Sequence, residues 1–234
     1  MSQRTARGDI SEGTNNRPYV FLDCGGLILD YTFNQDTLMR AHREACARLN
    51  TSEGVNVSLD EVIKAHRNAI AQYLKARKNH TEWTIYKLTG LMLEELGLKG
   101  KVFSSTLPFI YKLHDHDVKP RESTLESIPE LQMAARLGII SDSPHDSAEY
   151  ELIRYGMTRV FDPIVFSFQV GHRKPHPAIY KEALRKADLL KTPEQATFFS
   201  HDQEEVDGAL AVGMQAHLAF NLAEVLSKLK GDGE

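Results

Sequence analysis

The pattern of apolar residues divides this chain into a part where strands and helices alternate and a part that is only helical. Residues 19–25 read YVFLDCG, an apolar run ending in glycine that predicts a buried strand and a turn. From residue 36 to about residue 117 apolar residues recur at helical spacing. After Pro120 strands alternate with helices of about 10–15 residues, which is typical of parallel βαβ units. The sequence therefore predicts an α/β protein with a Rossmann-like open parallel sheet and an inserted all-helical domain.

These patterns also set the expected domain boundaries. Residues 1–17 are polar and are expected to form a flexible lead. The α/β core is expected to comprise residues 18–35 and 118–234, and the helical insert residues 36–117. The segment LHDHDV, residues 113–118, is expected to mark the polar end of an insert helix and its hinge back to the core, rather than a zinc site. Helices are expected at residues 36–49, 58–74, 83–97, 129–138, from 147, 177–187 and 204–213, and further strands at residues 138–141, 163–167, 196–200 and 216–220.

Charge and composition narrow the classes of partner. The 28 basic and 32 acidic residues give a net charge of -4, and the basic residues are scattered, so no nucleic-acid partner is expected. No apolar run approaches the roughly 20 residues needed to cross a bilayer, and no secretory signal is recognisable, so no membrane partner is expected. Two cysteines make no disulfide framework, and a cytoplasmic location is expected. The sequence leaves the oligomeric state open.

Four segments carry polar side chains at the predicted carboxyl ends of strands, where open parallel sheets bind ligands. They are residues 23–26, residues 141–143, the loop that holds Lys174, and residues 200–205. Taken singly, each segment has a structural explanation as a turn residue, a solvated lysine or an acidic helix N-terminus. Because all four occur in order and at equivalent places, their conjunction favours one functional site.

The order of these segments and their residues resemble the four motifs of the haloacid dehalogenase superfamily, over about residues 19–220. The first motif of that family reads D-x-D-G-T-L followed by an acid, and DCGGLILD matches it at Asp23, Gly26 and Asp30. RKPHPAIY and GALAVGM are the most specific matches. The resemblance implies a hydrolase with a helical cap that acts on a small anionic substrate.

Residue by residue, the resemblance implies a covalent mechanism. Asp23 would be the nucleophile that attacks phosphorus or carbon, and water would then resolve the intermediate. Ser141 and Lys174 would stabilise the developing negative charge, and Glu205 takes the place of the second acid of the fourth motif. The implied substrate-binding residues are Gly25, Gly26, Asp142, Tyr180, Ser200 and His201.

Three positions depart from the phosphatase pattern. Gly25 replaces the second Asp, which is the general acid and base of the phosphatases, and Leu27 replaces the Thr. His201 replaces the usual metal-binding Asp, so the expected magnesium site is weakened, because Mg²⁺ prefers oxygen ligands. The remaining oxygen donors for Mg²⁺ are Asp23, the Gly25 carbonyl, Asp202 and Glu205.

The same departures resemble the metal-independent 2-haloacid dehalogenases of the superfamily. Their first motif lacks the second Asp and their fourth reads S-S-N-x-x-D, on which residues 200–205 fall in order. Leu27 opposes this interpretation, since those enzymes also use a Thr there. A third alternative is a degenerate member that binds a ligand without turnover. The sequence leaves these alternatives open and does not identify the substrate.

Overall fold

The computed structural model describes most of the chain. Residues 1–16 of the predicted lead, and residues 113–115 of the LHDHDV segment, lie outside the described residues. The described ranges are residues 17–53, 55–98, 107–108, 110–111, 116–122, 124–157 and 159–231.

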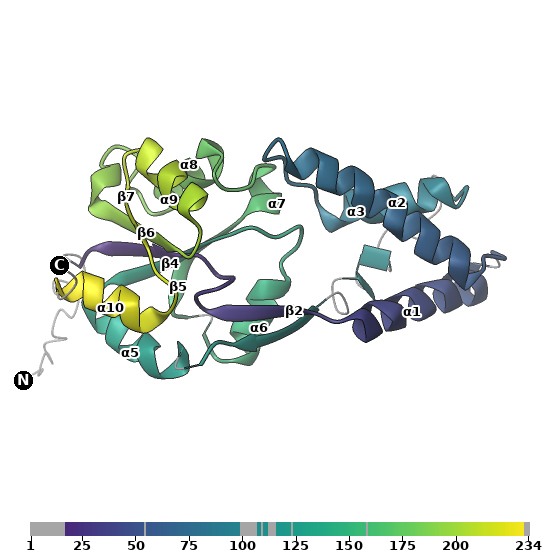
Figure 1. Cartoon of the computed structure of the whole chain (residues 1–234), viewed down its shortest axis with the longest axis horizontal. Helices are drawn as coiled ribbons and strands as arrows, with labels where there is room; N and C mark the ends of the chain where they lie inside the picture. Colours follow the sequence, from purple (N-terminus) through teal and green to yellow (C-terminus); the bar gives the residue numbers. More distant parts are fainter. Residues whose placement is uncertain are drawn as a thin grey trace, which may run out of the picture.

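A five-stranded parallel sheet forms the centre of the core, in the order β5-β4-β1-β6-β7. Helices α8 and α9 cover one face of the sheet, and α5, α6 and α10 cover the other (Figure 1). The predicted parallel α/β sheet is therefore confirmed. The strands are β1 (Tyr19–Leu22), β4 (Arg136–Ser141), β5 (Phe161–Phe166), β6 (Ala196–Ser200) and β7 (Gln215–Leu218), and the helices are α5 (Thr124–Ala134), α6 (Ser147–Arg154), α7 (Ser167–Val170), α8 (Pro177–Lys186), the 3-10 turn η1 (Pro193–Gln195), α9 (Gln203–Ala211) and α10 (Leu222–Lys230).

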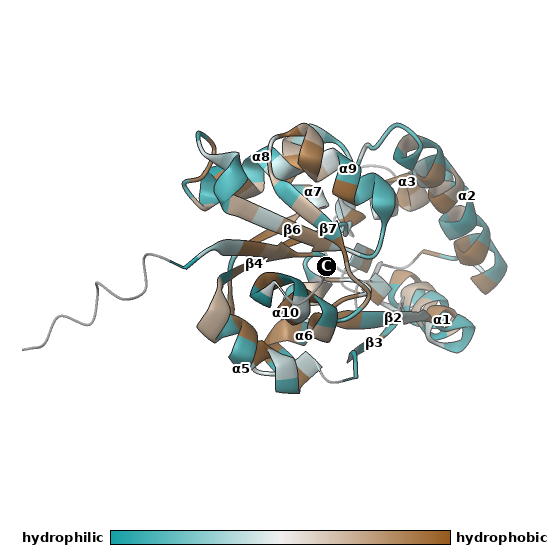
Figure 2. Ribbon diagram, turned by 60° about the vertical axis from the view of Figure 1, so that its left-hand side comes forward, coloured by the Kyte–Doolittle hydropathy of each residue, from teal (hydrophilic) through white to brown (hydrophobic). Residues whose placement is uncertain are grey.

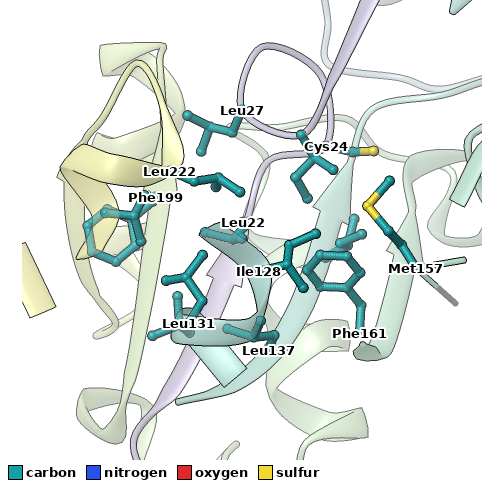
Figure 3. Close-up of a cluster of buried hydrophobic side chains, with 14 of the residues drawn as sticks. Leu22, Cys24, Leu27, Ile128, Leu131, Leu137, Met157, Phe161, Phe199 and Leu222 are labelled. Atoms are coloured by element: carbon teal, nitrogen blue, oxygen red, sulfur yellow. The ribbon is translucent and has the colours of Figure 1, made fainter. Parts of the chain in front are cut away.

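Side chains of β1 alternate between two buried clusters, as a strand covered on both faces requires. Leu22 and Cys24 belong to the cluster on the α5 and α10 side, together with Leu131 and Phe199 (Figure 3). Phe21 belongs to the cluster on the α8 and α9 side. Figure 2 shows the strands between helices in which hydrophilic and hydrophobic residues both occur. The apolar run that predicted this strand is thus explained by its double burial.

A two-stranded antiparallel ribbon, which the sequence did not predict, connects the core with the insert. It pairs β2 (Leu29–Phe33) with β3 (His116–Pro120). The expectation that residues 116–118 end a helix is therefore wrong, and so is the expectation that strands are missing up to residue 117. The ribbon forms because two segments distant in sequence pair with each other, which no local apolar pattern reveals.

The insert is a layer of helices with a hydrophobic cluster of its own (Figure 1). The predicted helices are α1 (Gln35–Glu53), α2 (Leu59–Arg77) and α3 (Ile85–Glu95). Ser58 and Glu61 form a capping box that fixes the start of α2, and the Thr84 side chain caps α3. None of the helices in the described ranges is long and apolar enough to cross a membrane.

Candidate active site

Asp23 lies at the carboxyl edge of the sheet, at the end of its central strand. Leu22 is in register with Ile139 of β4 on one side and with Phe199 of β6 on the other. The Asp23 backbone N–H donates to the Phe199 carbonyl at 2.9 Å, and the Asp23 side chain is buried. The carboxylate is therefore held by main-chain contacts of the most enclosed strand.

Lys174 approaches this carboxylate from the loop before α8. Its Nζ lies 2.5 Å from Asp23 Oδ1 and 3.0 Å from Glu205 Oε2, and it also donates to the Ile140 carbonyl at 3.1 Å. Only 1% of the Lys174 side chain is exposed. Burial alone would lower the pKa of Lys174, but the charges of Asp23 and Glu205 raise it well above its usual value. The lysine therefore stays positively charged at neutral pH.

Glu205 is held in the first turn of α9. The Ser200 hydroxyl donates to Glu205 Oε2 at 2.6 Å, and burial raises the pKa of Glu205 while Lys174 opposes the rise. Tyr180 is fully buried, and its hydroxyl donates to the Glu205 carbonyl at 2.7 Å. Contact between Tyr180 and a substrate would therefore require this part of the core to open, and in the closed core Tyr180 supports the backbone of Glu205.

His201 lies on the other side of the Asp23 carboxylate. Its Nδ1 is 3.4 Å from Asp23 Oδ2, and its ring occupies the space next to Gly26. Gly26 has a φ of +80°, and a Cβ at that position would meet Nδ1 at 2.5 Å, so a residue with a side chain would displace the ring. The contact with Asp23 raises the pKa of His201, and partial burial opposes this rise.

We expect His201 to titrate above its ordinary pKa of 6.5, because the Asp23 carboxylate stabilises the imidazolium. NMR titration of the histidine ring protons would measure this, and Asp23→Asn should return the His201 pKa towards 6.5. His217 is an internal control, since burial and Lys228 lower its pKa and it should not respond to the substitution. A His201 pKa that is the same in both proteins would contradict the contact.

Three of the predicted oxygen ligands for Mg²⁺, namely Asp23, Asp202 and Glu205, have protein partners in this structure. The Asp202 carboxylate accepts the Glu204 N–H at 2.8 Å and caps α9, so it is engaged at the helix end. Glu205 is bound by Ser200 and Lys174, and His201 faces Asp23 Oδ2. Within the described ranges no group of three or more His, Cys, Asp and Glu side chains is arranged to hold a metal ion.

The other predicted residues surround this centre. Ser141 is buried at the end of β4, and the next residue, Asp142, accepts the Lys174 backbone N–H at 3.0 Å through Oδ1. Burial raises the pKa of Asp142, against the opposing charges of Lys174 and Arg173. A Cβ on Gly25 would contact the Tyr31 ring at 3.7 Å. The structure thus joins Asp23, Lys174, Glu205, Ser200 and His201 directly and Asp142 through the lysine backbone.

Two charged residues that the sequence analysis did not select extend this cluster. Arg173 Nη2 lies 3.2 Å from Asp142 Oδ2, and Arg173 Nη1 lies 2.6 Å from Glu82 Oε2 of the insert. Because Arg173 directly precedes Lys174 in the sequence, its position near the candidate site could have been predicted. Glu82 follows a polar segment between two helices, and no local pattern distinguishes it from a solvated charge.

Comparison with known proteins identifies the family. The sequence model of the haloacid dehalogenase-like hydrolases matches residues 28–219, which is most of the chain. The chain belongs to this family. Glyceraldehyde 3-phosphate phosphatase of Methanothermobacter thermautotrophicus is 30% identical over 173 residues, covering 66% of this chain and 76% of the relative. The protein is therefore a haloacid dehalogenase-like hydrolase.

Solved structures share the fold. The 2-haloacid dehalogenase from Pseudomonas syringae pv. Tomato DC3000 superposes with a TM-score of 0.61 at 17% identity. The superposition covers 93% of this chain and 100% of the dehalogenase. The HAD-hydrolase YfnB from Bacillus subtilis, bound to magnesium, superposes with a TM-score of 0.54 at 14% identity, covering 91% and 98% of the two chains. At these identities the likeness extends to the fold alone.

Proposed function

We propose that the protein hydrolyses a small anionic substrate, of the phosphate monoester or haloacid type, through a covalent intermediate on Asp23. The contact of 2.5 Å between Asp23 Oδ1 and the buried ammonium of Lys174 carries this proposal. A carboxylate oxygen of Asp23 attacks the substrate, and the leaving group departs with the electrons of the broken bond. Water then cleaves the aspartyl intermediate, which releases the product and restores the carboxylate.

The buried ammonium of Lys174 lies on one side of Asp23, and on the other lies the imidazole of His201, whose pKa is raised by Asp23; both support this role. In the proposal, Lys174 and the imidazolium of His201 balance the charge of the nucleophile and of an anionic substrate. Ser141 and the backbone at Gly25 and Gly26 line the place where the substrate binds. The remaining predicted residues hold these groups in place, namely Glu205 and Ser200 at the lysine, Asp142 at its backbone, Tyr180 behind Glu205, and Asp202 at the start of α9.

We further propose that the helical insert is a cap. Residues 18–35 and 118–234 form the catalytic core in this proposal, and residues 36–117 close over the site and exclude water from it. The ribbon of β2 and β3 joins the two parts on one side. Closure of such a cap selects substrates by the side chains it presents.

We expect turnover to survive removal of divalent metal ions. The reason is that Asp202 and Glu205 are bound to other protein groups and His201 faces the nucleophile, so these residues do not form an oxygen cage around Asp23. The measurement compares kcat in excess chelator with kcat in added magnesium, together with calorimetric titration of Mg²⁺ into the protein. Turnover that appears only with magnesium would contradict metal independence and require the acids to rearrange.

A dehalogenase that attacks carbon is the second candidate, favoured by His201 at Asp23 and by Gly25 in place of a second acid. With attack at carbon the intermediate is an ester, and water attacks the Asp23 carbonyl carbon. One heavy oxygen from labelled water then enters the Asp23 side chain in a single turnover. With attack at phosphorus followed by water attack at phosphorus, the label enters the released phosphate instead. Mass spectrometry of the peptide containing Asp23 separates the two.

A substrate panel tests the proposal directly. Release of phosphate and of halide is measured from small phosphomonoesters and 2-haloacids, in chelator and in magnesium, with Asp23→Asn as the blank. Release that depends on Asp23 supports the proposal, and the product identifies the atom attacked. Binding of panel members without any release would contradict hydrolysis and support a protein that binds without turnover.

A further inference from the structure

The insert meets the core at a second place, far from the ribbon of β2 and β3. The turn between α2 and α3 lies beside the segment that follows α7 (Figure 1). The Glu82 N–H donates to the Gly171 carbonyl at 2.9 Å, and the Arg173 N–H donates to the His80 carbonyl at 2.8 Å. These bonds place the insert against the residue that directly precedes the active-site lysine.

The side chain of Glu82 is completely buried at this junction, with 0% exposed. In the insert, the Tyr73 hydroxyl donates to Glu82 Oε1 at 2.5 Å, and the Trp83 backbone N–H donates to the same oxygen at 3.0 Å. Ser167 and Arg173 of the core donate to Glu82 Oε2, both at 2.6 Å. A buried carboxylate with donors on both oxygens has a fixed orientation, because leaving any of these partners unpaired is costly.

From Glu82 an unbroken series of contacts leads to the nucleophile. Arg173, held by Glu82, also lies 3.2 Å from Asp142 Oδ2. The other oxygen of Asp142 accepts the Lys174 backbone N–H at 3.0 Å. Lys174 then reaches Asp23 with its ammonium group at 2.5 Å. Each member of this series is buried or nearly so, and therefore a shift of one is transmitted to the next.

We propose that Glu82 is a positioning residue, which acts from the insert through Arg173 and Asp142 to orient Lys174 towards Asp23. This inference rests on the proposed function of Asp23 and Lys174. It assigns the insert a second task besides covering the site, since the lysine is fully oriented only while the turn between α2 and α3 is docked. Docking of the insert and orientation of Lys174 towards Asp23 then occur together.

The test uses Glu82→Gln, which keeps the shape of the side chain but removes its charge, and Arg173→Gln, alone and combined. Glu130→Gln is the matched control, because it breaks an exposed ion pair with Lys230 at a distant place. We expect Glu82→Gln to lower kcat about tenfold with little change in KM, because small misplacements of catalytic groups are costly. The double variant should lose no more than the worse single variant, since both act through the same contacts.

Amide exchange at Lys174 gives a measurement that needs no turnover. Its N–H is held by Asp142, so Glu82→Gln should speed exchange at this amide, and Glu130→Gln should not. Unchanged kcat, additive losses in the double variant, or unchanged exchange at Lys174 would each overturn the proposal. If Glu82→Gln does not fold, Arg173→Lys gives the same two measurements. Should Asp23→Asn keep full turnover, the proposed function fails, whereas the exchange at Lys174 still judges the positioning role.

Discussion

Replacing Asp23 by asparagine is expected to abolish turnover while the protein remains folded. The amide is a poor nucleophile, and loss of the group that forms the covalent bond lowers kcat by about 10⁴-fold or more. The fold should persist because the contact of Asp23 with Phe199 uses the backbone N–H. Lys174 also keeps Glu205 and the Ile140 carbonyl as partners, so its ammonium is not left unpaired.

Turnover is measured by kinetics on the best substrate of the panel. Folding is measured by a thermal melt followed by circular dichroism. The intact mass of the variant checks that the amide has not hydrolysed back to a carboxylate. Asp207→Asn is the control, since Asp207 is exposed on α9 and its carboxylate accepts a hydrogen bond from Gln203, away from Asp23. Equal turnover in Asp23→Asn and the unchanged protein would remove the covalent mechanism.

The central sheet was predictable because each buried strand corresponds to a short apolar run in the sequence. YVFLDCG and ATFFS are apolar runs because β1 and β6 are covered on both faces, and the helices between strands show apolar residues at helical spacing. The start of α5 was less predictable. A helix was expected from Pro129, whereas α5 begins at Thr124 and contains this proline. Proline usually marks a first turn, and here the buried Thr124 and Ile128 extend the helix in front of it.

Contacts between distant segments were not predictable. In β2 only Leu29 is buried, so the strand has no apolar run, and its partner β3 lies beyond the whole insert. The contact between Glu82 and Arg173 depends in the same way on how the insert docks. No spacing rule along the chain carries that information.

The place of the candidate site followed from topology, and its internal contacts did not. Parallel strands bring their carboxyl ends to one edge, so Asp23, Ser141 and Ser200 had to be neighbours once the sheet order was known. The sequence also indicated that His201 replaces an acid. It did not indicate that this ring lies against Gly26 and faces Asp23, because the side-chain orientation depends on the turn formed there.

Replacing Lys174 by alanine is expected to lower kcat about 10²- to 10³-fold, which is the scale of losing one donor to a developing negative charge. The variant should also lose stability of about 3–5 kcal/mol at neutral pH, because Asp23 and Glu205 are then buried side by side without their cation. Burial already raises the pKa of Glu205, and without the opposing charge of Lys174 this pKa rises further. A carboxyl group whose pKa is higher in the folded than in the unfolded state stabilises the folded state at low pH. This stabilisation is lost as the pH rises through the pKa of the folded state. The variant should therefore be closest to the unchanged protein in acid and furthest from it at neutral pH.

Urea unfolding at several pH values measures the stability difference, and kinetics at the same pH values measure the loss of kcat. Lys186→Ala is the matched control, since Lys186 is exposed and its ammonium donates to the Ile164 carbonyl at 3.4 Å, away from Asp23 and Glu205, so neither quantity should change. A stability difference that is constant with pH would mean that Glu205 does not depend on Lys174 for its charge. A kcat that is unchanged in a folded variant would remove the lysine from the mechanism, and with it the contact on which the covalent role of Asp23 is argued.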